Sequence, residues 1–308
     1  MRLVASLATR GRPAQLLDTL RKHMACMARP DTLMVVQADS DDLATLSALS
    51  EAELDPRVKV NVQKRPDSVA AKWNRIMSEP ADVYLKSADD DPYITPDLDS
   101  KILEAASAFP DGIGMVYGHL ANASFPGVIA HTAKWCEKFG WMEPEFFPYW
   151  FSDHWTDDIG RIIGRIAFAD IRTDQSRAGR TQDLREPAWW ATWFDSAYLL
   201  RRAQAQKLIN DPDFQEPKWR KQILLTHHPL IEFRSKWIND TVRAQSRQLE
   251  AYASDPKKDD RYQRIKSAAV AMIPHLLDDY GMDPVEAARY RDFLLPPDKV
   301  VALPRAYG

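Results

Sequence analysis

Short apolar runs alternate with helix-like segments through the first 120 residues of the chain. The segments between the runs repeat apolar residues at helical spacing, as Leu16, Leu20 and Met24 do. Because strand and helix alternate at short intervals, the sequence predicts an α/β fold with a mostly parallel, doubly wound sheet. Strands are expected at 3–7, within 31–42, and at 58–62, 83–85 and 113–117, with helices at 16–27, 42–54, 68–77 and 96–108.

Polar clusters follow three of the expected strands. Thr9 and Arg10 come after the first strand, residues 39–42 (Asp-Ser-Asp-Asp) after the second, and residues 89–91 (Asp-Asp-Asp) after the fourth. In open parallel sheets the ligand crevice lies outside the carboxyl ends of the strands. A polar loop on its own indicates only a surface, but three on one edge predict a site.

The acidic triplet is the most specific of these clusters. Asp89 and Asp91 are two residues apart at a strand end, so their side chains can point to the same side of the chain. Two neighbouring carboxylates repel each other unless a cation lies between them. Mg²⁺ or Mn²⁺ would satisfy them together with substrate phosphates. The alternative is a solvated acidic loop ahead of the helix that begins near Pro96.

Composition excludes several classes of function. The chain of 308 residues is 45% hydrophobic and 28% charged, with a net charge of −3, which indicates a soluble globular protein with no strong general affinity for nucleic acid. No apolar run is long enough for a membrane span, and the N-terminus lacks the pattern of a signal peptide. Cys26 and Cys136 fit neither a disulfide framework nor a metal site, so we expect a cytoplasmic protein.

The second half of the chain has a different character. Residues 118–195 are rich in Trp, Phe, Pro and Asp, and from Phe194 the chain is helical in pattern. The Trp residues predict either an aromatic cleft or core packing. We therefore expect a first domain over residues 1–200 and a helical C-terminal extension over 201–308 that packs on it.

Four segments resemble the nucleotide-sugar glycosyltransferases of the GT-A fold, in particular the family 2-like group. In family order they are SLATRGRP, MVVQADSDD, SVAAKWNRIMSEPADVYLKSADDD and ADDDPYITPDL, the last with the spacing of the family's Asp-x-Asp motif. The resemblance is clear to about residue 120, weaker to about 200, and absent beyond. It implies a nucleotide-sugar half over about 1–120 and an acceptor half over about 118–200.

The resemblance also implies roles for individual residues. Asp91 would chelate the Mn²⁺ or Mg²⁺ that bridges the donor diphosphate, with Asp89 beside it on the ribose or the metal site, and His227 or His228 could complete the metal shell. The donor nucleotide would be contacted by Thr9, Arg10, Asp39 (or Asp41), Lys72, Asn74 and Asp89. Lys86 and Ser87 depart from the family's pattern in the fourth strand.

An inverting transfer needs a general base to take the proton of the acceptor hydroxyl. The stretch FPYWFSDHWTDDIGRIIGR carries acids at the start of an expected helix, and Asp153 is the first candidate, with Asp157 and Asp158 as alternatives. Acids in the first turn of a helix are also favoured by the helix dipole alone.

The sequence therefore predicts a metal-dependent glycosyltransferase that moves a sugar from a nucleotide-diphosphate sugar to an acceptor hydroxyl, with inversion implied by the resemblance. The acceptor, whether glycan, lipid-linked, protein or nucleic acid base, is not predicted. Two alternatives stay open: a sugar-nucleotide nucleotidyltransferase, although TRGRP has a single glycine where that class carries a glycine-rich loop, and a non-catalytic binding module on the same scaffold.

Overall fold

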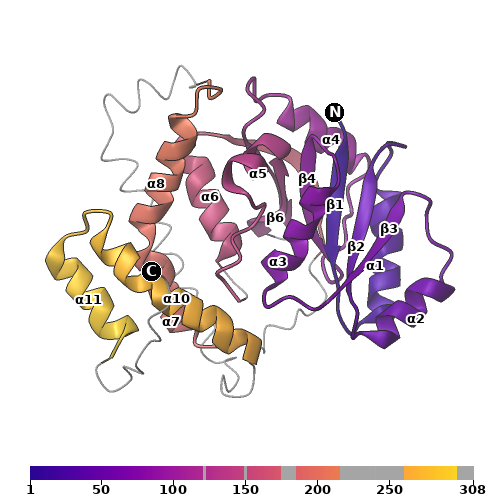
Figure 1. Ribbon diagram of the computed structural model, residues 1–308. Helices are drawn as coiled ribbons and strands as arrows, with labels where there is room; N and C mark the ends of the chain where they lie inside the picture. The colour runs from indigo at the N-terminus through magenta and orange to yellow at the C-terminus, as the bar shows by residue number, and fades with distance from the viewer. Residues whose placement is uncertain (121–122, 149–150, 175–184, 216–239, 241–259, 297–308) are drawn as a thin grey trace.

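The computed structural model describes residues 1–120, 123–148, 151–174, 185–215, 240 and 260–296. Its strands form one seven-stranded sheet of order β3-β2-β1-β4-β6-β5-β7 (Figure 1). The strands are β1 (Leu3–Ala8), β2 (Leu33–Asp39), β3 (Val58–Gln63), β4 (Val83–Ala88), β5 (Met115–Leu120), β6 (Ala123–Thr132) and β7 (Ile166–Thr173).

The first four strands are parallel, and the sheet changes direction at β6, which runs antiparallel to both β4 and β5. Ala8, the last residue of β1, pairs with Ala88 of β4 on one side and with Gln37 of β2 on the other. Because these strands end at nearly the same level, the loops that follow them leave the sheet side by side.

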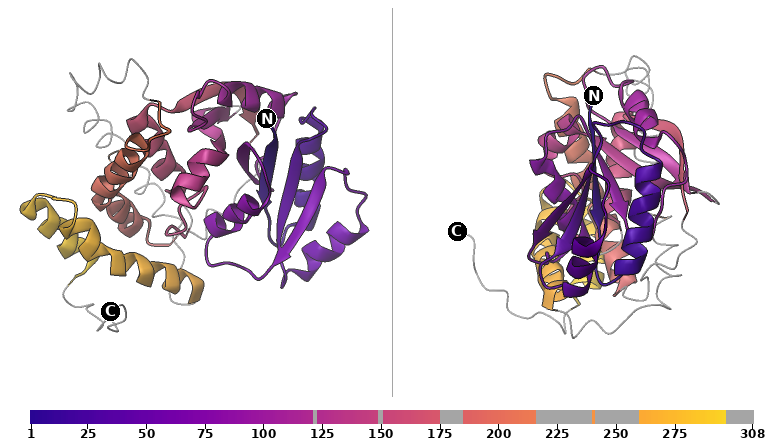
Figure 2. Two further views of the ribbon diagram at one scale, coloured as in Figure 1. Left: turned by 45° about the horizontal axis from the view of Figure 1, so that its top comes forward. Right: turned by 90° about the vertical axis from the view of Figure 1, so that its right-hand side faces the viewer.

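Helices cover both faces of the sheet (Figures 1 and 2). The apolar residues of α1, α2 and α4 pack with one face, and those of the remaining helices pack with the other. The helices are α1 (Pro13–Ala25), α2 (Leu43–Glu51), α3 (Val69–Asn74) with the 3₁₀ turn η1 (Arg75–Ser78), α4 (Leu98–Ala106), α5 (Ala133–Phe139), α6 (Ser152–Ile163), α7 (Pro187–Ser196), α8 (Tyr198–Ile209), α10 (Asp260–Asp278) and α11 (Pro284–Leu294).

Alternation along the central strand explains the two layers. In β1, Leu3, Ala5 and Leu7 point to the face of α1, while Val4 points to the opposite face. Every residue of β1 is buried, as expected for a strand with helices on both sides.

Local sequence signals set the starts of the helices that lead away from the sheet. Pro13 occupies the first turn of α1, where its missing N–H costs nothing. The side chains of Asp42 and Ser68 accept hydrogen bonds from the backbone N–H groups of Thr45 and Ala71, and so cap α2 and α3.

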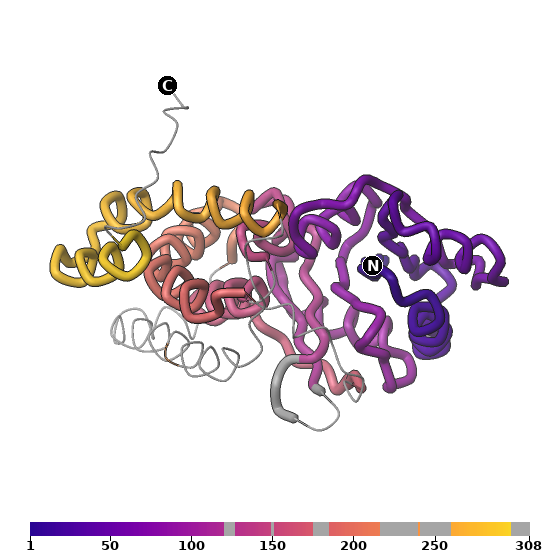
Figure 3. The backbone as a smooth tube through the Cα atoms, turned by 90° about the horizontal axis from the view of Figure 1, so that it is seen from below, coloured from indigo at the N-terminus to yellow at the C-terminus, as the bar shows by residue number. Residues whose placement is uncertain are grey.

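The large tryptophans of the second half form core rather than the walls of a cleft. Trp135, Trp155 and Trp193 have no exposed surface, and Trp190 is 2% exposed. They belong to one apolar cluster that continues into α10 and α11, so the C-terminal helices pack on the same core (Figure 3). Of the two expectations for these rings, core packing is the one that holds for the described tryptophans.

The predicted fold class, a mostly parallel α/β sheet with a helical C-terminal part, is confirmed. The sequence analysis missed β6, α5 and β7. No helix among the described residues is long and apolar enough to cross a membrane.

Candidate functional site

The loop after β1 lies against the acidic loops that follow β2 and β4. The guanidinium of Arg10 donates to Asp39 Oδ2 across 3.0 Å and to both carboxylate oxygens of Asp41 across 2.6 and 3.0 Å. The backbone N–H of Gly11 donates to Asp42 Oδ2 across 2.6 Å. Arg10 and the N–H of Gly11 therefore offset part of the negative charge at the end of β2.

The same loop holds the first two aspartates after β4. Thr9 Oγ1 donates to Asp89 Oδ2 across 2.7 Å, and Arg12 donates to Asp89 Oδ1 and, across 2.9 Å, to Asp90 Oδ2. The Asp89 side chain has no exposed surface. Burial raises the pKa of Asp89, although Arg12 and Thr9 favour its ionised form.

Lys72, on α3, contacts the ends of β1 and β2 from the face of the sheet that lies opposite α1. Its Nζ lies 2.8 Å from Asp39 Oδ1 and donates to the carbonyl of Thr9 across 2.9 Å. Burial lowers the pKa of Lys72, and the neighbouring Asp39 carboxylate opposes that shift. Asp39 is itself fully buried, so these two groups form a buried ion pair beneath the loop.

Helix α1 fixes the backbone of the acidic triplet. Gln15 Nε2 and Thr19 Oγ1 donate to the carbonyl of Asp89 across 3.1 and 2.7 Å, and His23 Nε2 lies 3.1 Å from the carbonyl of Asp91. The sequence analysis missed these residues. Their spacing of four, beside the buried Leu16, Leu20 and Met24 of the same helix, was the available signal.

Asn74 lies away from this group. Its side chain accepts from the N–H groups of Met142 and Glu143 across 3.0 and 2.9 Å, and donates to the carbonyl of Glu143 and to Glu145. The side chain of Asn74 therefore holds the 142–145 loop, since both its oxygen and its nitrogen form hydrogen bonds with that loop.

A second polar group lies beside β4, which carries Lys86. Lys86 Nζ is 3.0 Å from Glu143 Oε1, and Glu143 has no exposed surface. Burial raises the pKa of Glu143, whereas Lys86 favours its charged form. This pair was absent from the sequence analysis, in which Lys86 was noted only as a departure from the family's pattern.

Asp153 lies near this pair, in the first turn of α6. Its Oδ1 accepts from the backbone N–H of His154 across 2.9 Å and lies 3.0 Å from that ring's Nδ1, while its side chain is 24% exposed. Burial works to raise the pKa of Asp153, but His154 and Lys86 outweigh it and hold that pKa well below its ordinary range. Asp153 is therefore an ionised carboxylate that reaches solvent.

The two alternative acids of α6 are paired with arginines. Asp157 lies 2.7 Å from Arg161 Nε on the same helix. Asp158 accepts from Arg201 Nε across 2.6 Å, and neither side chain has exposed surface. Asp158 therefore joins α6 to α8 inside the core, a structural position rather than one open to a substrate.

The structure brings five of the predicted donor-site residues to one edge of the sheet: Thr9, Arg10, Asp39, Lys72 and Asp89. Asp91 follows in the same loop and is partly exposed. His227 and His228 lie outside the described residues.

The triplet fits a divalent cation only in part. No group of three or more His, Cys, Asp or Glu side chains within the described ranges could hold a metal ion by itself. Carboxylate oxygens suit Mg²⁺ and Mn²⁺, and such ions are often held by one or two carboxylates plus phosphates. Asp91 can serve in this way, whereas both oxygens of Asp89 are already engaged by Thr9 and Arg12.

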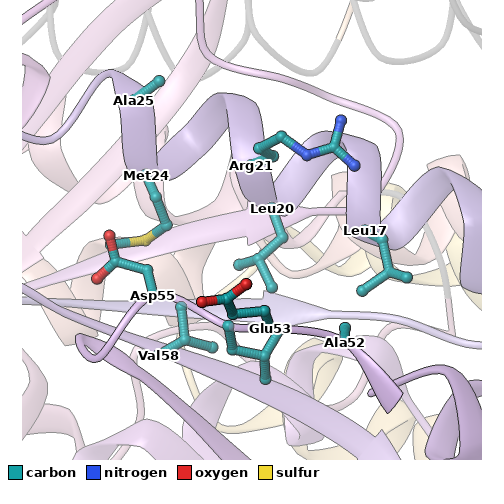
Figure 4. A pocket seen from close by; sticks show the side chains of 10 residues that line it. Leu17, Leu20, Arg21, Met24, Ala25, Ala52, Glu53, Asp55 and Val58 are labelled. Carbon is teal, nitrogen blue, oxygen red and sulfur yellow. The ribbon is translucent and has the colours of Figure 1, made fainter. Parts of the chain in front are cut away.

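A separate cavity of about 390 Å³ lies between α1 and the segment that leads into β3. Figure 4 shows Leu20 and Met24 of α1 facing Glu53, Asp55 and Val58 across it. Val58 begins β3, so this cavity is at the amino ends of the strands. The acidic triplet lies at the other, carboxyl ends of the strands.

No protein-family model matches the sequence, and no curated protein matches it. Among solved structures, the chain is similar to a mannosyltransferase of Pyrobaculum calidifontis, PcManGT, in complex with GDP-Man and Mn²⁺. The identity is 14% and the TM-score 0.48, with 96% of this chain and 87% of that chain covered.

The chain is also similar to two other solved structures. Residues 1–349 of S. aureus TarS in complex with UDP-GlcNAc match at 11% identity and a TM-score of 0.47, covering 96% of this chain and 88% of that one. A CMP:2-keto-3-deoxy-manno-octonic acid synthetase with CTP matches at 11% identity and a TM-score of 0.38, covering 56% of this chain and 90% of that one. At these TM-scores the likenesses carry no conclusion about chemistry, so function is argued from the site.

Proposed function

We propose that the protein is a glycosyltransferase that uses a nucleotide-diphosphate sugar as donor. The observation that carries the proposal is the convergence of three loops at the carboxyl ends of β1, β2 and β4. There Arg10, Arg12 and Lys72 alternate with the aspartates that follow β2 and β4. Cationic donors and carboxylates on one strand edge suit a ligand that carries a base, a ribose and a diphosphate.

The nucleoside would lie over the end of β2. Asp39 is fully buried and held by two cations, Arg10 and Lys72, so it would accept a hydrogen bond from the ribose or base once the ligand moves Arg10 aside. Thr9 belongs to the same group, and its hydroxyl donates a hydrogen bond to Asp89.

The diphosphate would lie over the triplet. Asp91 is the residue proposed to hold Mn²⁺ or Mg²⁺, with Asp89 beside it. When bound, such an ion stabilises the negative charge that develops on the leaving nucleoside diphosphate. The cations of residues 10–12 lie at the same edge and can donate directly to phosphate oxygens.

Asp153 is the proposed general base, and inversion follows if it acts on the acceptor hydroxyl. It is ionised, partly exposed and held in place by His154. Its two alternatives are weaker candidates, because Asp157 and Asp158 each form an ion pair with an arginine. A low pKa makes Asp153 a modest base in the free protein, so displacement of water by donor and acceptor would have to raise it.

The test is release of nucleoside diphosphate from a panel of nucleotide-sugars with Mn²⁺, with and without chelator. We expect one donor to be turned over in a chelator-sensitive reaction. Asp91→Asn should lower the rate about 100-fold or more, while Asp31→Asn, an exposed acid at the amino end of β2, should not. Release that is absent for every donor would contradict the proposal.

The same samples separate the alternatives. Pyrophosphate release from a nucleoside triphosphate and a sugar phosphate would identify a nucleotidyltransferase. Thermal stabilisation by UDP or GDP without any turnover would identify a binding module, because a ligand of the folded state raises its apparent stability.

A further inference from the structure

Arg12 engages two aspartates of the loop that carries the proposed metal ligand, Asp91. Its two terminal nitrogens contact two different carboxylates, Asp89 Oδ1 and Asp90 Oδ2, while Thr9 holds the other oxygen of Asp89. One guanidinium thus spans two of the three consecutive aspartates. It supplies, from within the chain, the positive charge that these carboxylates need.

The backbone directs Arg12 to this position. Gly11 has a φ of 64°, in the left-handed region that favours glycine, and its N–H is held by Asp42. Pro13 then begins α1. The turn therefore folds the chain so that the Arg12 side chain lies over the end of β4.

The guanidinium retains capacity for another acceptor. Arg12 Nε is buried and has no hydrogen-bond partner among the described residues, and the side chain as a whole is 22% exposed. A guanidinium binds phosphate through paired N–H donors at least as well as it binds carboxylates. A diphosphate bound over the triplet can therefore replace the aspartates as the hydrogen-bond acceptor of Arg12.

We infer that Arg12 is a resident counter-cation of the acidic triplet, which competes with a divalent metal in the free protein and transfers to the donor diphosphate when donor and metal bind. The inference rests on the proposed function, because it takes the ligand to be a nucleoside diphosphate with a divalent ion. It makes metal and nucleotide binding mutually dependent. Metal binds weakly until a diphosphate removes Arg12, and each ligand raises the affinity for the other by the same factor.

The experiment measures Mn²⁺ affinity from the signal of free Mn²⁺ in electron paramagnetic resonance, with and without UDP or GDP. In the wild-type protein we expect tight Mn²⁺ binding only with nucleotide. In Arg12→Met we expect Mn²⁺ alone to bind about 10-fold tighter than in the wild type, and the gain from nucleotide to shrink by about the same factor.

Arg29→Met is the matched control, since it removes the same charge from an exposed pair with Asp31 at the amino end of β2, and its Mn²⁺ affinity without nucleotide should equal that of the wild type. Thermal melting verifies that each variant folds. If Arg12→Met does not fold, Arg12→Lys, which keeps the charge but loses the two-pronged contact, should show a smaller shift in the same direction.

The outcomes separate this inference from the proposed function. If wild-type protein binds Mn²⁺ with nucleotide but Arg12→Met binds Mn²⁺ alone no tighter than the wild type does, the role of Arg12 is overturned and the proposed function stands. If neither protein binds Mn²⁺ even with either nucleotide, both the metal-dependent function and the role of Arg12 are overturned.

Discussion

The guanidinium of Arg201 lies 2.6 Å from the carboxylate of Asp158, and neither side chain has any exposed surface. Arg201 also donates to the carbonyl of Phe194, so one buried cation connects α6, α7 and α8. Five residues earlier on α6, Asp153 reaches solvent and has no arginine partner among the described residues. The two acids, both base candidates by sequence, therefore have different physical settings.

The first prediction separates these two acids by stability. Asp158→Ala leaves the buried guanidinium of Arg201 without its carboxylate, and breaking a buried pair in this way costs about 3–5 kcal/mol. Asp153→Asn loses a partly exposed contact with the adjacent residue and should cost about 1 kcal/mol or less. Urea denaturation of both variants measures the difference.

The second prediction concerns activity of the same two variants. If Asp153 is the base, Asp153→Asn should lower the rate of sugar transfer about 10²–10⁴-fold while it stays folded. Asp158→Asn, assayed under conditions where it is folded, should retain most of its rate. A folded Asp153→Asn with the wild-type rate would exclude Asp153 as the base.

The third prediction concerns the buried pair of Lys86 and Glu143. Lys86→Met leaves Glu143, which has no exposed surface, without its cation and should destabilise the fold by about 3 kcal/mol. Adding Glu143→Gln removes the stranded charge, so the double variant should be more stable than Lys86→Met alone. A double-mutant cycle in urea checks this, and additive costs would contradict a coupled pair.

The fourth prediction is a pH dependence of stability from His131. Burial, assisted by the nearby Lys86 ammonium, lowers the pKa of His131 to about 3, so the ring is neutral in the folded state. The unfolded chain takes up a proton near pH 6.5, and stability should therefore be full above that pH and fall as the pH drops toward 3, by up to about 1.4 kcal/mol per unit.

The control for that pH dependence is His131→Phe, which removes the titrating ring and should flatten the decline between pH 6.5 and 5. His23, whose pKa burial lowers to about 4, contributes with the same sign, so part of the slope should persist. Denaturant midpoints at several pH values measure it. An unchanged slope in His131→Phe would show that His131 is already solvated or charged in the folded protein.

The fifth prediction tests the hydrogen bonds from α1 to the triplet. Thr19→Val keeps the shape of the side chain but removes the donor to the carbonyl of Asp89. We expect a loss of about 1 kcal/mol in stability and several-fold weaker binding of UDP or GDP with Mn²⁺, because the loop backbone is less well held. Ser107→Ala, an exposed hydroxyl at the end of α4, should change neither quantity.

The sequence was enough to predict that the loops after β1, β2 and β4 lie together, because this depends on little more than parallel pairing of the strands. Once β1, β2 and β4 are neighbours in register, Thr9, Asp39 and Asp89 must emerge at one edge. The roles of these residues in donor binding stay predictions. The sequence pattern was sufficient for their position because apolar runs and turn residues are local signals.

Contacts between distant segments were not predictable in this way. Asn74 meets a loop about 70 residues later, and Asp158 meets an arginine 43 residues later on another helix. Each is a site candidate by sequence, because a polar side chain carries no sign of a partner so far along the chain. The antiparallel β6 was missed because its sequence, ASFPGVIAHT, contains a Pro and a Gly, which are uncommon inside strands.

The short segment from Thr9 to His23 holds both the side chains and the backbone of the acidic loop, through Thr9 and Arg12 on one hand and Gln15, Thr19 and His23 on the other. Residues 89–91 are thus not a module that can be exchanged alone. A chimera that carries another protein's acidic loop should fold correctly at this site only when the segment equivalent to residues 9–23 comes from that same protein.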